Sequence, residues 1–235
     1  MKDWVKYYEE SLYNLQNGVL NIVQNAKTPF FLTGGTALSR HYTLHRYSDD
    51  LDFFVISNPD YTAHVTTILQ KLGRQDRNHG LSFDLANLNR GEAYTQLFVT
   101  HKDYPEIELK VEFINDVAVH YGDIITDRIL GRIDSIRNIL SNKLTALFRS
   151  EPKDVTDIHA IALSEKFNWR EIVTEAKSKE AGIEPEVIYD ILKSFPIKSL
   201  ETIKWIDRPT NKIFQNNIQT IANDILHGRE NSLQA

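Results

Sequence analysis

The sequence predicts an α/β (α+β) fold, with a mixed sheet in the first half of the chain and a helical lobe in the second half. Two observations lead to this prediction. Up to about residue 120, short apolar or alternating runs typical of strands are interspersed with helical segments. From about residue 136, apolar residues recur almost throughout at helical spacing. We therefore expect a first lobe over residues 1–135 and a helical C-terminal lobe over residues 136–235.

The elements of the first lobe follow from these patterns in chain order. Apolar residues three and four apart, after the helix-capping residue type Asp3, predict a helix over residues 3–25. Two further helices are expected over 36–44, after Gly34 and Gly35, and over 61–75. The strand-like segments, of which the last three read as successive antiparallel strands, are 30–33, 50–56, 81–89, 94–101 and 107–116.

The second lobe contains no strand signal of comparable strength. Its expected helices span 136–150, 154–167, 169–179, 185–195 and a final segment that ends near residue 228. The lobes are therefore predicted to differ in class, with mixed α/β structure before the boundary and helices after it.

Composition excludes several classes of protein. The 235 residues include no cysteine, which excludes disulfides and thiolate metal sites. We find neither an apolar run of membrane-spanning length nor a signal peptide, so we expect a cytoplasmic protein without membrane contact. A net charge of −5 argues against non-specific coating of nucleic acid. Positive charge is concentrated only at Arg128, Arg132, Arg137, Lys143, Arg149 and Lys153, where nucleic acid would bind if it binds at all.

Two aspartates at the start of an apolar strand are the first candidate site. In "SDDLDFFV", strand alternation places Asp50 and Asp52 on one face and Leu51 and Phe53 on the other. Such a carboxylate pair could bind divalent cations such as Mg²⁺, which prefer oxygen ligands. The alternative is a polar strand terminus that faces water.

A glycine turn precedes this pair. In "TGGTALSR", Gly34 and Gly35 would let the backbone approach a ligand closely, and the amides at the start of the following helix attract phosphate. Thirteen residues between Thr36 and Asp50 suffice for a helix and a return, which would bring the turn beside the carboxylates. Arg46, just before the pair, is either a phosphate contact or a structural charge partner of the aspartates.

These residues together resemble the AbiEii/AbiGii type of nucleotidyltransferase toxins, within the polymerase-beta-like nucleotidyltransferase superfamily. The family signature runs Gly-Gly-Thr-x-Leu, then Arg-x-Ser-x-Asp-(Ile/Leu)-Asp-Phe. The positions that match it are Gly34, Gly35, Thr36, Leu38, Arg46, Ser48, Asp50, Leu51, Asp52 and Phe53. The resemblance covers roughly residues 30–160 and implies that Gly34, Gly35, Thr36, Arg46 and Ser48 bind nucleotide.

A second block, "LSNKLTALFRSEPKDVTDIHAI", is similar to a later family motif and selects the toxin branch. It is matched by Lys143, Ala146, Arg149, Asp154 and Asp157. The resemblance implies that Lys143 contacts the nucleotide and that Asp157 orients this lysine or contacts the base or sugar. The alternative for Lys143 is a solvated helix residue, whereas we expect Arg149 and Asp154 first of all to form an ion pair between helices.

The resemblance also implies a third acid on a later strand. In "IELKVEFIND", the side chains Glu108, Lys110, Glu112 and Asp116 share the face opposite Leu109, Val111 and Phe113. We favour Glu112 over Asp116 and Glu108. The predicted metal ligands are thus Asp50, Asp52 and Glu112, and the predicted catalytic residues add Lys143 and Asp157. His41 and His45 have no third ligand near them in sequence, and we interpret them as surface or packing residues.

The implied activity is transfer of a nucleoside monophosphate from an NTP, with Mg²⁺ or Mn²⁺ as cofactor. The resemblance makes the 3′ end of tRNA a candidate acceptor and an antitoxin protein a candidate partner. The acidic overall charge fits a small-molecule or protein acceptor equally well. One alternative is a module that binds GTP or another NTP without catalysis. The other is a small-molecule nucleotidyltransferase of the antibiotic-resistance kind, against which the second block argues.

Overall fold

The computed structural model describes residues 4–234, with the side chains of all of these except 75–79 and 85. Asp3, the predicted helix cap, lies outside the described residues. The chain forms two units that alternate along the sequence. Unit 1 comprises the described residues up to Ala37 together with Ser48–Val117 and Ile124–Asp134. Unit 2 comprises Leu38–Tyr47, Ala118–Asp123 and the described residues from Ser135 onward.

Unit 1 is built on a mixed sheet, which confirms the predicted fold class. The strands are β1 (Phe31–Thr33), β2 (Leu51–Ile56), β3 (Leu81–Phe83), β4 (Asn89–Arg90), β5 (Tyr94–His101), β6 (Tyr104–Asp116), β7 (Ile125–Asp127) and β8 (Gly131–Ile133). Their spatial order is β3-β5-β6-β2-β1-β8-β7, and β4 pairs with β5. The β2–β6 and β1–β8 pairs are parallel, whereas the other pairs are antiparallel. β2 thus lies inside the sheet, between β1 and β6.

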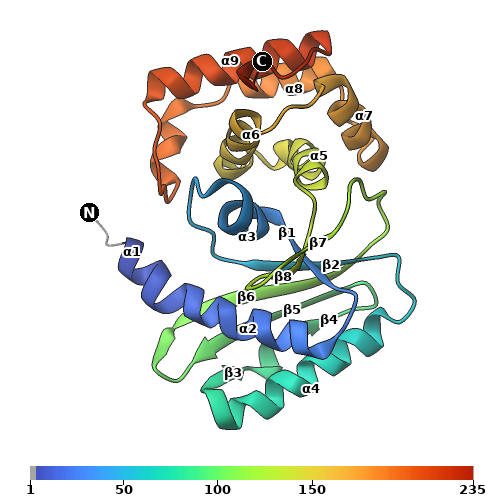
Figure 1. Ribbon diagram of the computed structural model, residues 1–235, viewed down its shortest axis with the longest axis vertical. Helices are drawn as coiled ribbons and strands as arrows, with labels where there is room; N and C mark the ends of the chain where they lie inside the picture. The colour runs from blue at the N-terminus through green and yellow to red at the C-terminus, as the bar shows by residue number, and fades with distance from the viewer. Residues whose placement is uncertain (1–3, 235) are drawn as a thin grey trace. The chain divides into compact units, whose positions relative to one another are not determined.

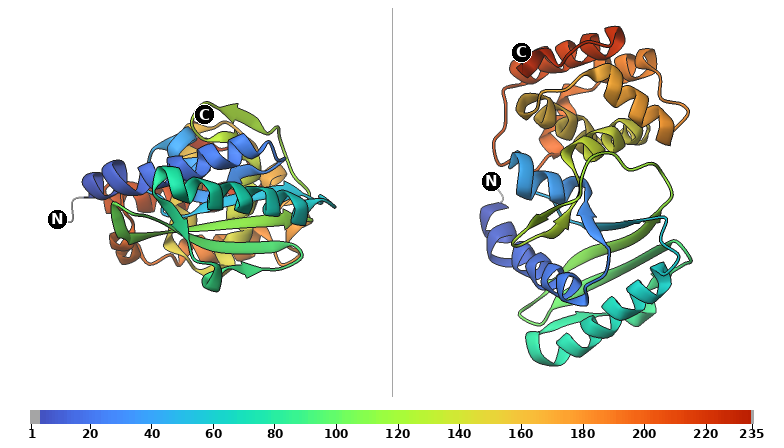
Figure 2. Two further views of the ribbon diagram at one scale, coloured as in Figure 1. Left: turned by 90° about the horizontal axis from the view of Figure 1, so that it is seen from below. Right: turned by 45° about the vertical axis from the view of Figure 1, so that its right-hand side comes forward.

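Helices cover one face of this sheet. The N-terminal helix runs through α1 (Trp4–Tyr7), the π-helical segment η1 (Tyr8–Leu12) and α2 (Tyr13–Ala26), and α4 spans Tyr61–His79. Both α2 and α4 lie along the same face (Figures 1 and 2). On this face, the rings of Phe53 and Phe113 stack with centroids 5.2 Å apart, and the ring of Phe30 packs edge-on against those of Phe113 and Tyr61. This apolar contact leaves the alternate residues of β2 and β6 for the other face.

The structure corrects three details of the predicted strands. Asp50 lies just before β2 rather than within it. The predicted strand 81–89 is broken into β3, the 3₁₀ turn η3 (Leu85–Asn87) and β4, because the Asp84 carboxylate accepts a hydrogen bond from the amide of Ala86. The β7–β8 hairpin was not predicted, since each of its strands has only three residues.

Unit 2 consists of helices among its described residues, as predicted from residue 136 onward. They are η2 (Leu38–Thr43), α5 (Ile136–Ala146), η4 (Leu147–Arg149), α6 (Pro152–Ser164), α7 (Trp169–Lys179), α8 (Pro185–Lys193), η5 (Ile197–Thr202), α9 (Asn211–His227) and η6 (Ser232–Gln234). Capping side chains fix several starts: Ser135, Asn168 and Thr210 accept bonds from amides of the first turns of α5, α7 and α9. Over residues 4–234, no helix combines the length and apolarity that crossing a bilayer requires.

Candidate active site

The register of the sheet brings Asp52 and Glu112 together. β2 and β6 run parallel with Asp52 opposite Glu112, which places the carboxyl groups of these two residues side by side. Their neighbours Leu51, Phe53 and Phe113 are buried, so the alternation predicted for both strands is present. Of the three candidates for the third acid, Glu112 is therefore the one that contacts Asp52.

The two other candidates lie elsewhere on β6. Asp116 is opposite Ile56, at the far end of β2, and its carbonyl accepts a bond from the amide of Ser57. Glu108 is exposed and precedes the part of β6 that pairs with β2. Neither carboxylate is in register with Asp52.

Lys110 supplies positive charge to these acids. Its Nζ lies 3.0 Å from Oε2 of Glu112 and 3.3 Å from Oδ2 of Asp50. The Tyr94 hydroxyl donates a further hydrogen bond to Glu112. Burial acts to raise the pKa of Glu112, but the bonds from Tyr94 and Lys110 outweigh it and lower this pKa. We call Asp50, Asp52, Glu112 and Lys110 the carboxylate site.

Asp52 carries the opposite shift. Burial first, and then the hydrogen bond and negative charge of Glu112, raise the pKa of Asp52 to about 7. Two adjacent carboxyl groups cannot both ionise easily at such close range, so Asp52 keeps its proton to a higher pH than Glu112 does. The site therefore has more negative charge than Lys110 neutralises.

The glycine turn packs directly over Asp52. Gly34 has φ +67°, in the left-handed region that glycine adopts without strain. A Cβ added at this residue would lie only 2.7 Å from Oδ2 of Asp52. The α3 segment (Gly34–Ala37) begins here, so Gly34 serves both the turn from β1 into α3 and the close approach to the carboxylate.

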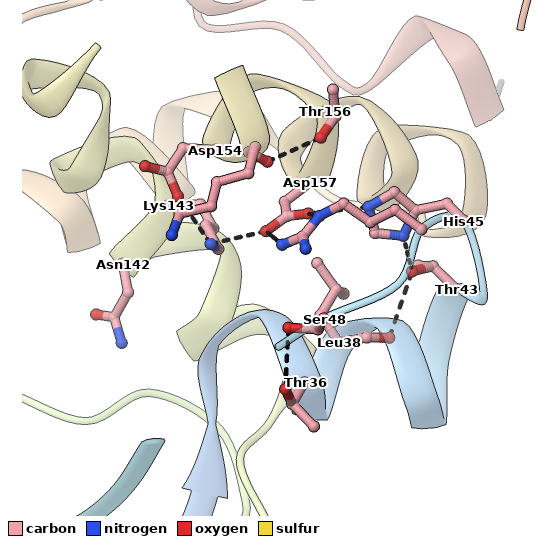
Figure 3. A network of polar contacts seen from close by, with 12 residues as sticks. Thr36, Leu38, Thr43, His45, Ser48, Asn142, Lys143, Asp154, Thr156 and Asp157 are labelled. Atoms are coloured by element: carbon pink, nitrogen blue, oxygen red, sulfur yellow. Dashed lines mark hydrogen bonds and ion pairs between the residues drawn. The ribbon is translucent and has the colours of Figure 1, made fainter. Parts of the chain in front are cut away.

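Three side chains hold the segment that leads into β2. The Thr36 hydroxyl is buried, 2.5 Å from the carbonyl oxygen of Asp50, to which it donates, and 2.9 Å from Oγ of Ser48 (Figure 3). Gln16 of α2 is fully buried and donates to the carbonyls of Ser48 and Asp49 at 3.0 and 3.1 Å. The Tyr8 hydroxyl of η1 donates to the carboxylate of Asp49.

Sequence analysis missed Gln16 and Tyr8, because their partners are more than 30 residues away in the chain. The only local signal at the N-terminal helix was amphipathic spacing, which predicts burial of one face but not what a polar residue on that face contacts. The structure shows that this helix fixes the backbone immediately before Asp50.

The carboxylate oxygens of the site are suitable ligands for a divalent cation, although they are not arranged around a common point in this structure. No group of three or more His, Cys, Asp or Glu side chains among the described residues is arranged to hold a metal ion. In the carboxylate site, an ammonium is the cation shared by Asp50 and Glu112. Three carboxylates with excess negative charge are nevertheless the oxygen ligands that Mg²⁺ or Mn²⁺ prefers. Asp50, Asp52 and Glu112 therefore fit a metal by the chemistry of their oxygens, and two of them, Asp52 and Glu112, lie side by side.

The second sequence block forms a separate buried network in unit 2. Asp157 is fully buried and accepts bonds from Nε and Nη2 of Arg46, at 2.7 and 2.8 Å. Nζ of Lys143 lies 2.7 Å from Asp157 and 2.8 Å from Asp154 (Figure 3). His45 completes the group with Nε2 at 2.9 Å from Asp157. We call these five residues the Asp157 cluster.

The charges in the Asp157 cluster balance. Burial acts to raise the pKa of Asp157, but the charges of Arg46 and Lys143 hold it well below its usual value. Burial likewise acts to lower the pKa of Lys143, and Asp157 and Asp154 reverse this into a net increase. The charges of Arg46 and Lys143 thus offset those of the two aspartates within a largely buried set.

The cluster decides between alternatives that the sequence left open for two residues. His45 lies beyond the end of η2, is 9% exposed and binds Asp157, so of the surface and packing interpretations the second applies to it. Lys143 is only 7% exposed, so it is not a solvated helix lysine. Arg149 does form the expected ion pair with Asp154, at 3.0 Å.

Neighbouring acids neutralise part of the basic stretch. Arg137 pairs with Glu171 at 2.9 Å and also with Glu175. Lys143 and Arg149 pair with aspartates of α6, as described above. The net positive charge that this stretch offers to a polyanion is therefore smaller than the sequence suggests.

The sequence and the fold were compared with those of known proteins. The family model described as "Nucleotidyl transferase AbiEii toxin, Type IV TA system" matches residues 21–231. No curated protein sequence matches the chain significantly. The crystal structure of JHP933 from Helicobacter pylori is 20% identical with a TM-score of 0.60, and covers 92% of each chain.

Two further solved structures agree. A putative nucleotidyltransferase from H. pylori is 21% identical with a TM-score of 0.60, over 93% of this chain and 96% of that chain. MenT4, a nucleotidyltransferase toxin from Mycobacterium tuberculosis, is 20% identical with a TM-score of 0.62, over 95% and 85%. At this identity the three structures support the fold, and the family match extends over most of the sequence. The chain therefore belongs to the AbiEii nucleotidyltransferase toxin family of type IV toxin–antitoxin systems.

Proposed function

We propose that this nucleotidyltransferase toxin transfers a nucleoside monophosphate from an NTP to a hydroxyl acceptor at the carboxylate site. The acceptor oxygen would form a bond to the α-phosphorus and release its proton to solvent, the bond from this phosphorus to the bridging oxygen of the β-phosphate would break, and pyrophosphate would leave. Asp50, Asp52 and Glu112 would hold the divalent cations. Bound Mg²⁺ or Mn²⁺ would make the acceptor hydroxyl more acidic and neutralise the charge of the leaving pyrophosphate.

One observation carries this proposal: Asp52 and Glu112 are adjacent on parallel strands, directly beneath the Gly34 turn. Rigid strands keep the two carboxylates in place, and the absence of a side chain at Gly34 leaves space next to Asp52. The match to a nucleotidyltransferase family supports nucleotidyl transfer as the reaction at these carboxylates.

The other predicted site residues are assigned roles on different kinds of evidence. Gly35 adjoins the turn over Asp52 and is proposed to contact phosphate through its backbone. Thr36 and Ser48 are proposed to act through the backbone they hold, because both are buried and hydrogen-bonded. For Lys143, Arg46 and Asp157, the family resemblance supports a nucleotide role. Their mutual ion pairs support a structural one.

The proposed acceptor is the 3′ end of tRNA, and the proposed partner is an antitoxin encoded with the toxin. Both rest on the family. A module that binds an NTP without transfer is the alternative, and it would not require the acids of the carboxylate site.

Incubation of the purified protein with each α-³²P-labelled NTP, Mg²⁺ and total cellular RNA tests the acceptor. We expect one labelled band of tRNA size, which disappears in Asp50→Asn protein and when EDTA is added. NTP binding by calorimetry without label transfer to RNA, protein or small molecules would instead support the binding module.

A further inference from the structure

We propose that Lys110 is the resident counter-cation of the carboxylate site and competes with the divalent metal for Asp50 and Glu112. This inference rests on the proposed function, because it concerns the same acids. In this proposal, Lys110 controls when the metal binds to the acids.

The position of the ammonium is the first argument. Nζ of Lys110 contacts a carboxylate oxygen of Asp50 and one of Glu112, at 3.3 and 3.0 Å. These are two of the three acids that would hold the metal, and they come from different segments of unit 1. A single cation that joins both acids occupies the electrostatic position that a metal would take.

The second argument is that Lys110 can leave. It stands two residues before Glu112 on β6 and therefore projects from the same face of the strand. Its side chain is 32% exposed, so it is not enclosed by the protein. A lysine with four flexible carbons can turn outward without disturbing the buried neighbours Leu109 and Val111.

The third argument concerns charge. Among the ion pairs of the described residues, Lys110 provides the cation that contacts Asp50 and Glu112. Without it, the carboxylates of Asp50, Asp52 and Glu112 would repel one another. The ammonium relieves this repulsion in the metal-free protein, but a metal must then displace it. Lys110 thus stabilises the metal-free site and weakens its affinity for a metal that arrives without nucleotide.

The test is Mn²⁺ binding to nucleotide-free protein, measured by calorimetry and by the electron paramagnetic resonance of free Mn²⁺. Lys110→Met keeps most of the stem and removes the charge, and Lys110→Arg keeps the charge. Lys102→Met removes an equal charge from an exposed lysine between β5 and β6. We expect Lys110→Met to bind Mn²⁺ about tenfold more tightly than wild type. Lys102→Met should stay within about twofold because screening weakens the effect of an exposed charge outside the site, and Lys110→Arg because it keeps the charge.

Thermal unfolding provides a second readout on the same proteins. Without metal, Lys110→Met should melt below wild type, and Mn²⁺ should raise its melting temperature more than that of wild type. If Lys110→Met does not fold, Lys110→Gln replaces it, with circular dichroism to establish folding.

The outcomes separate this inference from the proposed function. Unchanged or weaker Mn²⁺ affinity in Lys110→Met overturns the competition, while the metal site stands if Asp52→Asn abolishes binding. No Mn²⁺ binding in either wild type or Lys110→Met also overturns the competition, whereas undiminished binding in Asp52→Asn overturns both.

Discussion

Asp52 is the residue on which the site depends, because three separate features converge on its carboxylate. The Gly34 turn lies above it, Glu112 lies beside it in the sheet, and burial with the charge of Glu112 raises its pKa to about 7. The aspartate pair could be found from sequence because strand alternation is a local rule. The close contact with Gly34 could not, since it depends on how β1 and β2 pair.

Gly34→Ala should impair both folding and transfer. The substitution places a Cβ at φ +67° and 2.7 Å from Asp52, so the turn or the carboxylate must move. Gly73→Ala is the matched control, because Gly73 lies in α4 and an added Cβ meets nothing within 4 Å. We expect Gly73→Ala to stabilise the protein by about 0.5–1 kcal/mol in urea unfolding. Equal activity and stability in the two variants would contradict the proposed contact.

Lys143→Met distinguishes a structural from a nucleotide-binding lysine. Loss of the ammonium leaves Asp154 and Asp157 buried without one of their partners, so we expect a loss of about 3 kcal/mol in the free energy of unfolding. The exposed Lys153→Met, nearby in α6, should cost almost nothing. Calorimetry with NTP and Mg²⁺ on folded Lys143→Met then measures nucleotide affinity. Unchanged affinity would remove Lys143 from the proposed nucleotide site.

At the scale of elements, the N-terminal helix does more than cover the sheet. Gln16 and Tyr8 bind the backbone and side chain of residues 48–49, and η1 is a π-helical segment, a form often found near functional sites. Periodicity predicted this helix and the central strands, because burial of one face leaves a repeating signal. It failed for β7, β8 and the broken strand 81–89, where short pairing and the Asp84 turn decide the structure.

Gln16→Leu tests the helix as a positioning element. The variant leaves two carbonyls near Asp50 without their donor, which should cost about 1–3 kcal/mol of stability and reduce kcat more than KM. Gln24→Leu, on the same helix, also removes a side-chain bond to a carbonyl, that of Ile129, but lies away from the acids. We expect its kcat to match wild type. A similar loss of kcat in both variants would show that the helix acts through stability alone.

At the scale of the whole molecule, the residues of the sequence motifs divide between the two units. Asp50, Asp52 and Glu112 belong to unit 1, whereas Arg46, Lys143 and Asp157 belong to unit 2. The first motif is itself divided, because Arg46 and Ser48 lie on opposite sides of a unit boundary. Sequence spacing alone gives no sign of this division, since unit 2 includes residues 38–47, far from the rest of it in the chain.

His159 should make the stability of the protein depend on pH. Burial, and then the charge of His45, lower the pKa of His159 to about 4, against about 6.5 in the unfolded chain. Between pH 6.5 and pH 4, His159 is protonated in the unfolded state but neutral in the folded state. The free energy of unfolding therefore falls as the pH decreases from 6.5 to 4. The loss is about 3 kcal/mol at most. In urea titrations His159→Gln should flatten this slope, whereas exposed His227→Gln should keep it. Equal slopes in all three proteins would contradict the assignment.

The most direct test of nucleotidyl transfer at Asp52 compares NTP labelled at the α-phosphate with NTP labelled at the γ-phosphate. Wild-type and Asp52→Asn proteins are incubated with each label, Mg²⁺ and total RNA, and their melting temperatures are recorded. We predict that wild type transfers the α label and releases the γ label as pyrophosphate. We further predict that Asp52→Asn transfers neither and melts at or above the wild-type temperature, since the substitution removes negative charge beside Glu112. Transfer of the γ label, or undiminished α transfer by a folded Asp52→Asn protein, would contradict nucleotidyl transfer at Asp52.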